Sequence, residues 1–180
     1  MDLGAMSIGA IPAGIYQTCS PEEIAYILNH SEAPVVLVEN QAQLDKVLSI
    51  QDETPHLKQI VLMRGTEANG DSVLGWDAFL AAAEKTDASA VAEHVEALDP
   101  ATAATFIYTS GTTGKPKGVV LTHANITSNL NSLHRVFDLA GEDVSLAFMP
   151  WAHSMGQTVE LHGMLSYGGS IAINDEIPNL

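Results

Sequence analysis

The sequence predicts an α/β fold in which a layered, largely parallel sheet is flanked by helices. Apolar runs of strand length alternate with segments of helical periodicity, and this alternation is typical of parallel sheets. Helix start signals stand between the runs, as at Ser20 and Asn40. The 180 residues are 46% hydrophobic, which is enough apolar side chain for a core and argues against a disordered chain.

We expect residues 1–84 to form a first α/β region. Residues 3–11 have the character of a helix end, and residues 12–16 that of a short strand. Ser20 and Glu23 have the spacing of a capping box, which predicts that a helix begins after Ser20. The apolar runs and stripes that follow predict a helix after Asn40, strands over residues 35–38 and 60–63, and a short helix over residues 76–83.

Residues 85–104 are acidic and rich in alanine, so we expect a surface connector there, with a possible helix over residues 87–98. Residues 105–180 then form a second α/β region. Its longest helix is indicated by apolar residues spaced four, three and four apart, which lie on one helical face: Ile126, Leu130, Leu133 and Phe137. The expected strands span residues 105–109, 119–121, 144–149 and 170–173, and a further helix spans residues 153–166.

The formal charge of −15 comes from 22 acidic and seven basic residues. Such a surface repels nucleic acid, so we expect no nucleic-acid partner. Two of the seven cations, Lys115 and Lys117, lie two positions apart, which indicates a shared use. The single cysteine, Cys19, excludes an intramolecular disulfide and, without a convincing signal peptide, predicts a cytoplasmic protein. No cluster of ligand residues has zinc spacing, so no metal site is predicted.

Residues 109–118 combine four hydroxyl side chains, three glycines and two lysines. Glycines let the backbone turn tightly, and successive N–H groups in such turns form a nest for anions. The loop differs from the P-loop of common NTPases, because Lys115 is followed by Pro116 and then by a strand rather than a helix. A flexible surface linker is the alternative, but linkers seldom lie between two buried strands. The sequence therefore predicts a phosphate-binding loop that joins two strands.

The run from Tyr108 to Gly118 resembles the signature loop of the adenylate-forming superfamily, which includes acyl-CoA synthetases, luciferases and peptide-synthetase adenylation domains. The resemblance implies that the loop binds the β- and γ-phosphates of ATP and that Lys117 also has a catalytic role. The residues to which it assigns cofactor binding are Thr109, Ser110, Gly111, Thr112, Thr113, Gly114, Lys115 and Lys117.

Residues 9–28 and 149–153 resemble the long- and medium-chain fatty acyl-CoA synthetase branch of that superfamily. His153 takes the position of the substrate-side histidine, which implies a catalytic and acid-binding role. The alternative for His153 is an ordinary histidine that caps the following helix. Trp151 is expected to bind substrate, with core packing as the alternative.

The resemblance implies an enzyme that activates a fatty or other carboxylic acid with ATP and Mg²⁺ and transfers it to CoA. Several parts of that machinery have no counterpart in the sequence, among them the segment that stacks on adenine and the lysine of the C-terminal domain. We therefore expect an N-terminal-domain fragment that is inactive alone and self-associates. Peripheral membrane association is a further possibility. The competing interpretations are an aryl-CoA ligase, an amino-acid adenylation domain, and a non-catalytic stand-alone nucleotide-binding or interaction module.

Overall fold

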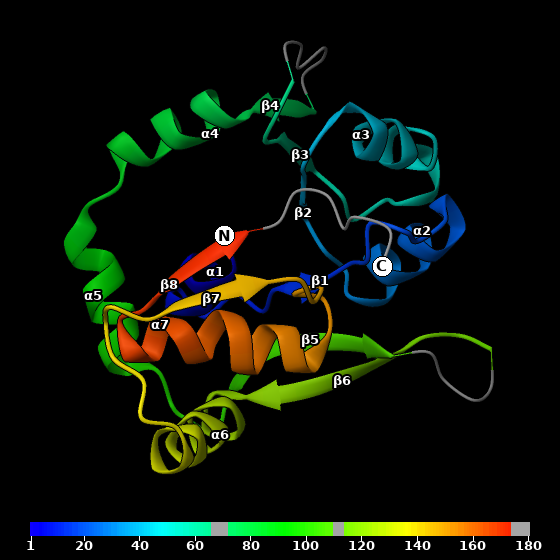
Figure 1. The fold of residues 1–180 in the computed structure, drawn as a ribbon. Helices are drawn as coiled ribbons and strands as arrows, with labels where there is room; N and C mark the ends of the chain where they lie inside the picture. Colours follow the sequence, from blue (N-terminus) through cyan, green and yellow to red (C-terminus); the bar gives the residue numbers. More distant parts are fainter. Residues whose placement is uncertain (66–71, 110–113, 174–180) are drawn as a thin grey trace. The chain divides into compact units, whose positions relative to one another are not determined.

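The computed structural model describes residues 1–65, 72–109 and 114–173, and it divides the chain into two compact units (Figure 1). One unit combines Met1–Gly14 with His94–Leu180, and the other is Ile15–Glu93. Both are built from helices and small, mostly parallel sheets, so the α/β prediction is confirmed. The first 14 residues join the C-terminal unit because strand β1 (Ala13–Gly14) pairs with strand β5 (Ala103–Thr109). The predicted division at residues 85–104 stays a prediction.

The unit formed by residues 15–93 contains a three-stranded parallel sheet in the order β2-β3-β4. Its strands are β2 (Val35–Val38), β3 (Gln59–Leu62) and β4 (Val73–Gly75). Its helical elements are α2 (Pro21–His30), α3 (Gln41–Leu48), η1 (Gln51–Glu53), α4 (Trp76–Ala82) and η2 (Ala83–Lys85). Helix α5 (Ala88–Ala97) lies within the predicted connector and crosses the boundary between the two units.

The core of this unit lies between the central strand β3 and helices α2 and α3. Ile60 of β3 is 1% exposed and belongs to one cluster with Leu28 of α2 and Val47 of α3. The predicted capping box is present: the Glu23 N–H donates to Ser20 Oγ at 3.3 Å, and the Ser20 N–H donates to a Glu23 carboxylate oxygen at 2.8 Å. This cap satisfies two backbone donors that would otherwise lack partners and defines where α2 begins.

Cys19 lies half-buried just before this cap. Burial raises the pKa of the Cys19 thiol, and the negative charge of Glu23 raises it further. The folded state therefore favours the neutral thiol. This preference stabilises the fold below the pKa of the unfolded thiol, about 8.5, and the contribution is lost as pH rises through the higher folded value.

Because the thiolate is the reactive form, we expect iodoacetamide to alkylate Cys19 several-fold more slowly in the folded chain than in urea-unfolded chain at pH 8. The measurement is the rate of mass increase under each condition. An equal or faster rate in the folded chain would contradict this assignment and would indicate an activated cysteine.

The other unit contains two sheets among its described residues. In the first, β1 runs parallel to β5, and β5 runs antiparallel to β6 (Lys117–Thr122). In the second, β7 (Val144–Ala147) and β8 (Ser170–Ile173) run parallel. The helices are α1 (Asp2–Ser7), α6 (His123–Val136), the π-helix η3 (Gly156–Gly163) and α7 (Met164–Tyr167).

Three sequence expectations for this unit need correction. The helix expected over residues 153–166 is in large part a π-helix. In a π-helix the backbone hydrogen bonds join residues five positions apart, not four. The strand expected at 119–121 begins earlier, at Lys117, because it pairs with β5 along its whole length. The apolar strand residue Val120 is 54% exposed, so the expectation of a buried strand is wrong within the described chain. Self-association through such exposed residues stays a prediction.

Candidate functional site

Strands β5 and β6 form an antiparallel hairpin, and the predicted phosphate loop connects them (Figure 1). The Cα atoms of Thr109 and Lys117 are cross-strand partners at the loop end of the hairpin, and both residues are exposed. Two residues predicted to face phosphate therefore lie opposite each other on paired strands. The predicted site residues Ser110, Gly111, Thr112 and Thr113 lie outside the described residues.

The strands beneath the loop are held by packing and by glycine. Thr105 and Tyr108 of β5 are 0% and 5% exposed, so this strand is fixed in the interior. Gly118 lies opposite Tyr108, and a Cβ atom there would come within 3.3 Å of the tyrosine ring. Gly114 has a φ of +93°, a conformation that glycine adopts without strain. The glycines of the motif therefore serve close backbone approach and a left-handed turn.

Lysines at the loop create a local positive charge in an acidic chain. Lys115 and Lys117 are both exposed, and they are two of the seven basic residues in a chain of formal charge −15. Two lysines close together in a chain of negative net charge give this loop a local positive potential that attracts anionic ligands. An ammonium group beside backbone N–H groups and hydroxyls suits phosphate oxygens.

His153 lies just before the α-helical turn, Ser154 and Met155, that leads into η3, and its side chain caps that turn. Its Nδ1 accepts a hydrogen bond from the Met155 backbone N–H at 3.2 Å, and the backbone N–H of His153 donates to the Pro150 carbonyl at 2.9 Å. The first bond places the ring proton on Nε2, which leaves Nε2 as the donor that the exposed ring presents. Capping and substrate contact are therefore compatible, because they use different ring nitrogens.

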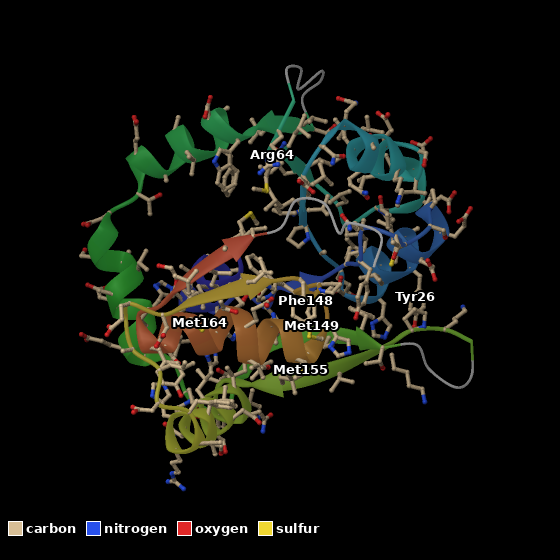
Figure 2. All side chains as sticks on the ribbon, in the orientation of Figure 1. Tyr26, Arg64, Phe148, Met149, Met155 and Met164 are labelled. Carbon is tan, nitrogen blue, oxygen red and sulfur yellow. The ribbon has the colours of Figure 1, made fainter. Side chains whose placement is uncertain are left out.

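Trp151 is half-buried, and its indole N–H donates to a carboxylate oxygen of Glu160 at 3.2 Å. Figure 2 shows Phe148, Met149 and Met155 gathered at the end of the helix where η3 begins. Phe148 and Met155 are 65% and 55% exposed, so an apolar surface lies beside this segment. The residue types suit an apolar substrate, while the substrate role of Trp151 stays a prediction.

The segment that contains His153 is joined to the loop strand through β1. A Cβ atom at Gly14 would lie 2.7 Å from the Cα of Ala152, so the two backbones are in direct contact. Gly14 in turn pairs with Ile107 of β5. Within the described residues no hydrogen bond links His153 to Thr109 or Lys117. The structure thus places both segments in one unit, on either side of β1.

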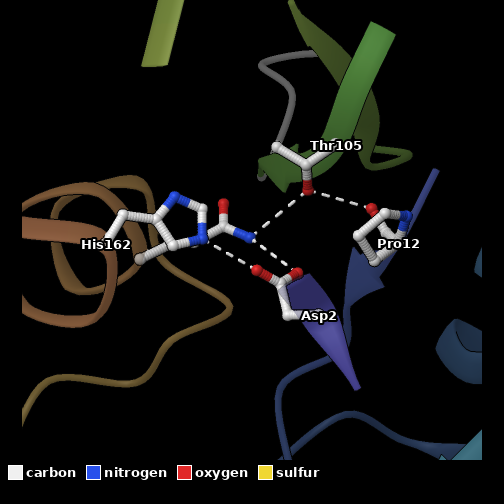
Figure 3. Close-up of polar contacts among 5 residues, drawn as sticks. Asp2, Pro12, Thr105 and His162 are labelled. Atoms are coloured by element: carbon white, nitrogen blue, oxygen red, sulfur yellow. Dashed lines mark hydrogen bonds and ion pairs between the residues drawn. The ribbon is translucent and has the colours of Figure 1, made fainter. Parts of the chain in front are cut away.

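A buried polar network that sequence reasoning missed lies nearby (Figure 3). His162 Nε2 lies 2.8 Å from Asp2 Oδ2, and the Gln157 amide donates to Asp2 Oδ1 and to Thr105 Oγ1, each at 3.3 Å. The Thr105 hydroxyl donates to the Pro12 carbonyl at 2.9 Å. The partners are up to 160 positions apart, so no local pattern could reveal them. His162 is 5% exposed.

Within the part of the chain that the structure describes, no group of three or more His, Cys, Asp or Glu residues is placed to hold a metal ion. The described helices also include none long and apolar enough to cross a membrane. The candidate site consists of the hairpin end and the His153 segment.

A family model described as AMP-binding enzyme matches residues 1–180, the whole of the sequence. The chain belongs to the AMP-binding enzyme family. Among curated relatives, long-chain-fatty-acid–CoA ligase ACSBG2 from Xenopus laevis is 34% identical over 176 residues, which are 94% of this chain and 24% of the relative. This AMP-binding chain thus spans about a quarter of that relative's length.

Solved structures confirm the fold of this AMP-binding chain. The anthranilate CoA ligase AuaEII in complex with anthranoyl-AMP matches with a TM-score of 0.71 and 25% identity, over 93% of this chain and 30% of that one. A red-emitting luciferase from Phrixothrix hirtus matches with a TM-score of 0.72 and 22% identity, over 97% and 34%. The fold and family predictions are confirmed, while the roles of individual site residues remain predictions.

Proposed function

We propose that this chain supplies the ATP phosphate-binding loop, and part of the acid-binding wall, of a long-chain fatty acyl-CoA ligase. The observation that carries the proposal is the hairpin end, where Thr109 and Lys117 face each other beside a glycine turn within an AMP-binding family chain. The 34% identity to a long-chain-fatty-acid–CoA ligase supports the fatty-acid class of substrate.

In the proposed reaction the carboxylate of the acid attacks the α-phosphate of ATP, and pyrophosphate leaves. The thiol of CoA then displaces AMP from the acyl adenylate to give the thioester. Mg²⁺ enters with ATP as part of the substrate. Lys117 and the hydroxyls and N–H groups of the loop would offset the charge of the leaving pyrophosphate, and His153 Nε2–H would donate to the acid.

Replacing Lys117 by alanine is expected to weaken Mg–ATP binding by the chain about 10- to 100-fold. A charge-assisted hydrogen bond is worth roughly 1.5–3 kcal/mol, and each 1.4 kcal/mol is a factor of about ten in affinity. The measurement is isothermal titration of ATP in the presence of excess Mg²⁺.

Lys58→Ala is the matched control, because it removes one exposed positive charge that lies outside the hairpin. It should leave ATP affinity within about twofold. Equal losses in both variants would mean that only net charge is sensed. If the wild-type chain does not bind Mg–ATP, the isolated segment does not have a working phosphate-binding loop.

An aryl-CoA ligase is the second candidate, favoured by the 25% identity to the anthranilate CoA ligase. Assays of a ligase as long as the curated relatives, with this segment in it, would distinguish the two candidate functions. ATP–pyrophosphate exchange that depends on palmitate supports the first candidate, and exchange that depends on anthranilate supports the second. The exposed apolar side chains beside His153 suit an aliphatic chain.

A further inference from the structure

Residues 156–163 form a π-helix, and a feature of the fold must stabilise it. π-Helices are rare and usually short, so eight residues in this form need an explanation. Gly156 and Gly163 at the two ends ease the backbone geometry, but glycine also permits an ordinary α-helix, so glycine alone does not select the π form.

The spacing of two buried side chains supplies the explanation. Gln157 and His162 are five residues apart, which is the interval that the π hydrogen-bond pattern closes. Both bind the same carboxylate, since the Gln157 amide donates to Asp2 Oδ1 at 3.3 Å and His162 Nε2 lies 2.8 Å from Asp2 Oδ2. In an α-helix, residues five apart point about 140° away from each other, so one carboxylate could not bind both.

Asp2 is held in place independently of this bridge. Helix α1, which carries it, packs through Met6 into a cluster with Ala104 of β5 and Ile126 of α6. Gln157 and His162 are 4% and 5% exposed, so neither side chain can satisfy its polar atoms with bulk water. A helix that left the π form would therefore leave buried donors and a carboxylate unpaired, at a substantial energetic cost.

The helical register is transmitted to His153. The Gln157 N–H donates to the His153 carbonyl at 2.9 Å. A Cβ atom at Gly156 would lie 2.6 Å from the Pro150 carbonyl oxygen, so the first turn of the helix lies directly on the segment that contains His153. This close backbone contact would transmit a change of register at Gln157 to that segment.

The side-chain amide of Gln157 also links η3 to strand β5, which leads into the loop. Gln157 donates to Thr105 Oγ1, and Thr105 lies four residues before Thr109 at the hairpin end. Gln157 itself lies four residues after His153. One side chain therefore connects the strand that supports the phosphate loop with the helix that presents the substrate-side histidine.

We infer that Asp2, Gln157 and His162 are positioning residues: the Asp2 carboxylate locks η3 in the π form and thereby sets where His153 presents Nε2 relative to the phosphate loop. The role of His153 in this inference rests on the proposed function. The lock itself does not, because it concerns hydrogen bonds that exist without ATP or acid.

The test uses NMR of the isotope-labelled 180-residue chain and its Asp2→Ala variant. Scalar couplings across hydrogen bonds identify the carbonyl that each amide of residues 161–163 binds. We expect carbonyls five residues earlier in the wild type and four residues earlier in the variant. The ¹⁵N shifts of the His153 ring should change with the register, because its Nδ1 bond to the Met155 N–H depends on the helix start.

Thr105→Val is the matched control, because it removes a buried hydroxyl of the same network but leaves the Asp2 bridge intact. It should keep the five-residue couplings and the His153 ring shifts. If Asp2→Ala does not fold, the same couplings and ring shifts are measured in Gln157→Met. This substitution removes the amide and keeps a similar side-chain length.

Five-residue couplings that persist without the bridge would overturn the lock, as would α-helical couplings in the wild type. A register change with unaltered His153 shifts would overturn the positioning role. The ATP titration with Lys117→Ala is a separate measurement, so a failure of the proposed function would be recognised independently.

Discussion

Replacing Ile60 by alanine is expected to lower the free energy of unfolding of the unit formed by residues 15–93 by about 2–5 kcal/mol. Ile60 is 1% exposed at the centre of the parallel sheet, between strands β2 and β4. Its side chain belongs to a cluster to which α2 and α3 both contribute. Removing three methyl or methylene groups there costs their transfer free energy and also leaves a cavity that the strand backbone cannot close.

The two tryptophans allow this loss to be assigned to one unit, because Trp76 lies in one unit and Trp151 in the other. In a Trp151→Phe background, the fluorescence of Trp76 follows urea unfolding of the unit of Ile60, and linear extrapolation gives its stability. Leu80→Ala is the control in the same unit, since Leu80 is 49% exposed, and it should change stability by no more than about 0.5 kcal/mol. Equal losses of unfolding free energy in Ile60→Ala and Leu80→Ala would mean that the core around the sheet does not dominate the stability of this unit.

Gly156→Ala is expected to destabilise the other unit by about 1–3 kcal/mol. The added Cβ would lie 2.6 Å from the Pro150 carbonyl oxygen and 3.1 Å from its carbon. Both atoms belong to the backbone, so no side-chain rotation relieves the overlap, and residues 150–156 must move. In a Trp76→Phe background, the fluorescence of Trp151 reports urea unfolding from within the affected segment.

Gly4→Ala is the matched control, because Gly4 also lies in a helix of the same unit but has open space around it. Alanine there should be neutral or stabilise the unit by about 0.5 kcal/mol, since it reduces the entropy of the unfolded chain. A neutral Gly156→Ala would show that the segment near His153 yields easily, and it would weaken the transmission argument for the π-helix.

The elements that the sequence predicts well are those with local signals. The start of α2 follows from Ser20 and Glu23, whose capping bonds are made within four residues. The hairpin also follows from local sequence, because glycines and Pro116 interrupt two apolar runs, and the structure pairs these runs as β5 and β6. The family assignment rests on the same loop, and the match over residues 1–180 confirms it.

The pairings between distant segments have no such signal. The parallel pairing of β1 with β5 joins Ala13 to Phe106, and it moves the first 14 residues into the C-terminal unit. Strand burial was overestimated for the same reason, since an apolar run such as that of β6 indicates a strand but does not say what covers it. Burial depends on which other elements pack there.

By itself, the sequence determined the fold class and the family, because each is encoded in residues that are neighbours along the chain. The phosphate-binding chemistry of residues 109–118 stays a prediction. The tertiary structure alone decided that Thr109 and Lys117 face each other, that the His153 side chain caps the turn leading into a π-helix, and that Asp2 bridges Gln157 and His162. The physical reason is that a π-helix is unfavourable by local preference. It forms here where a partly exposed carboxylate from a distant part of the sequence binds two buried side chains five residues apart.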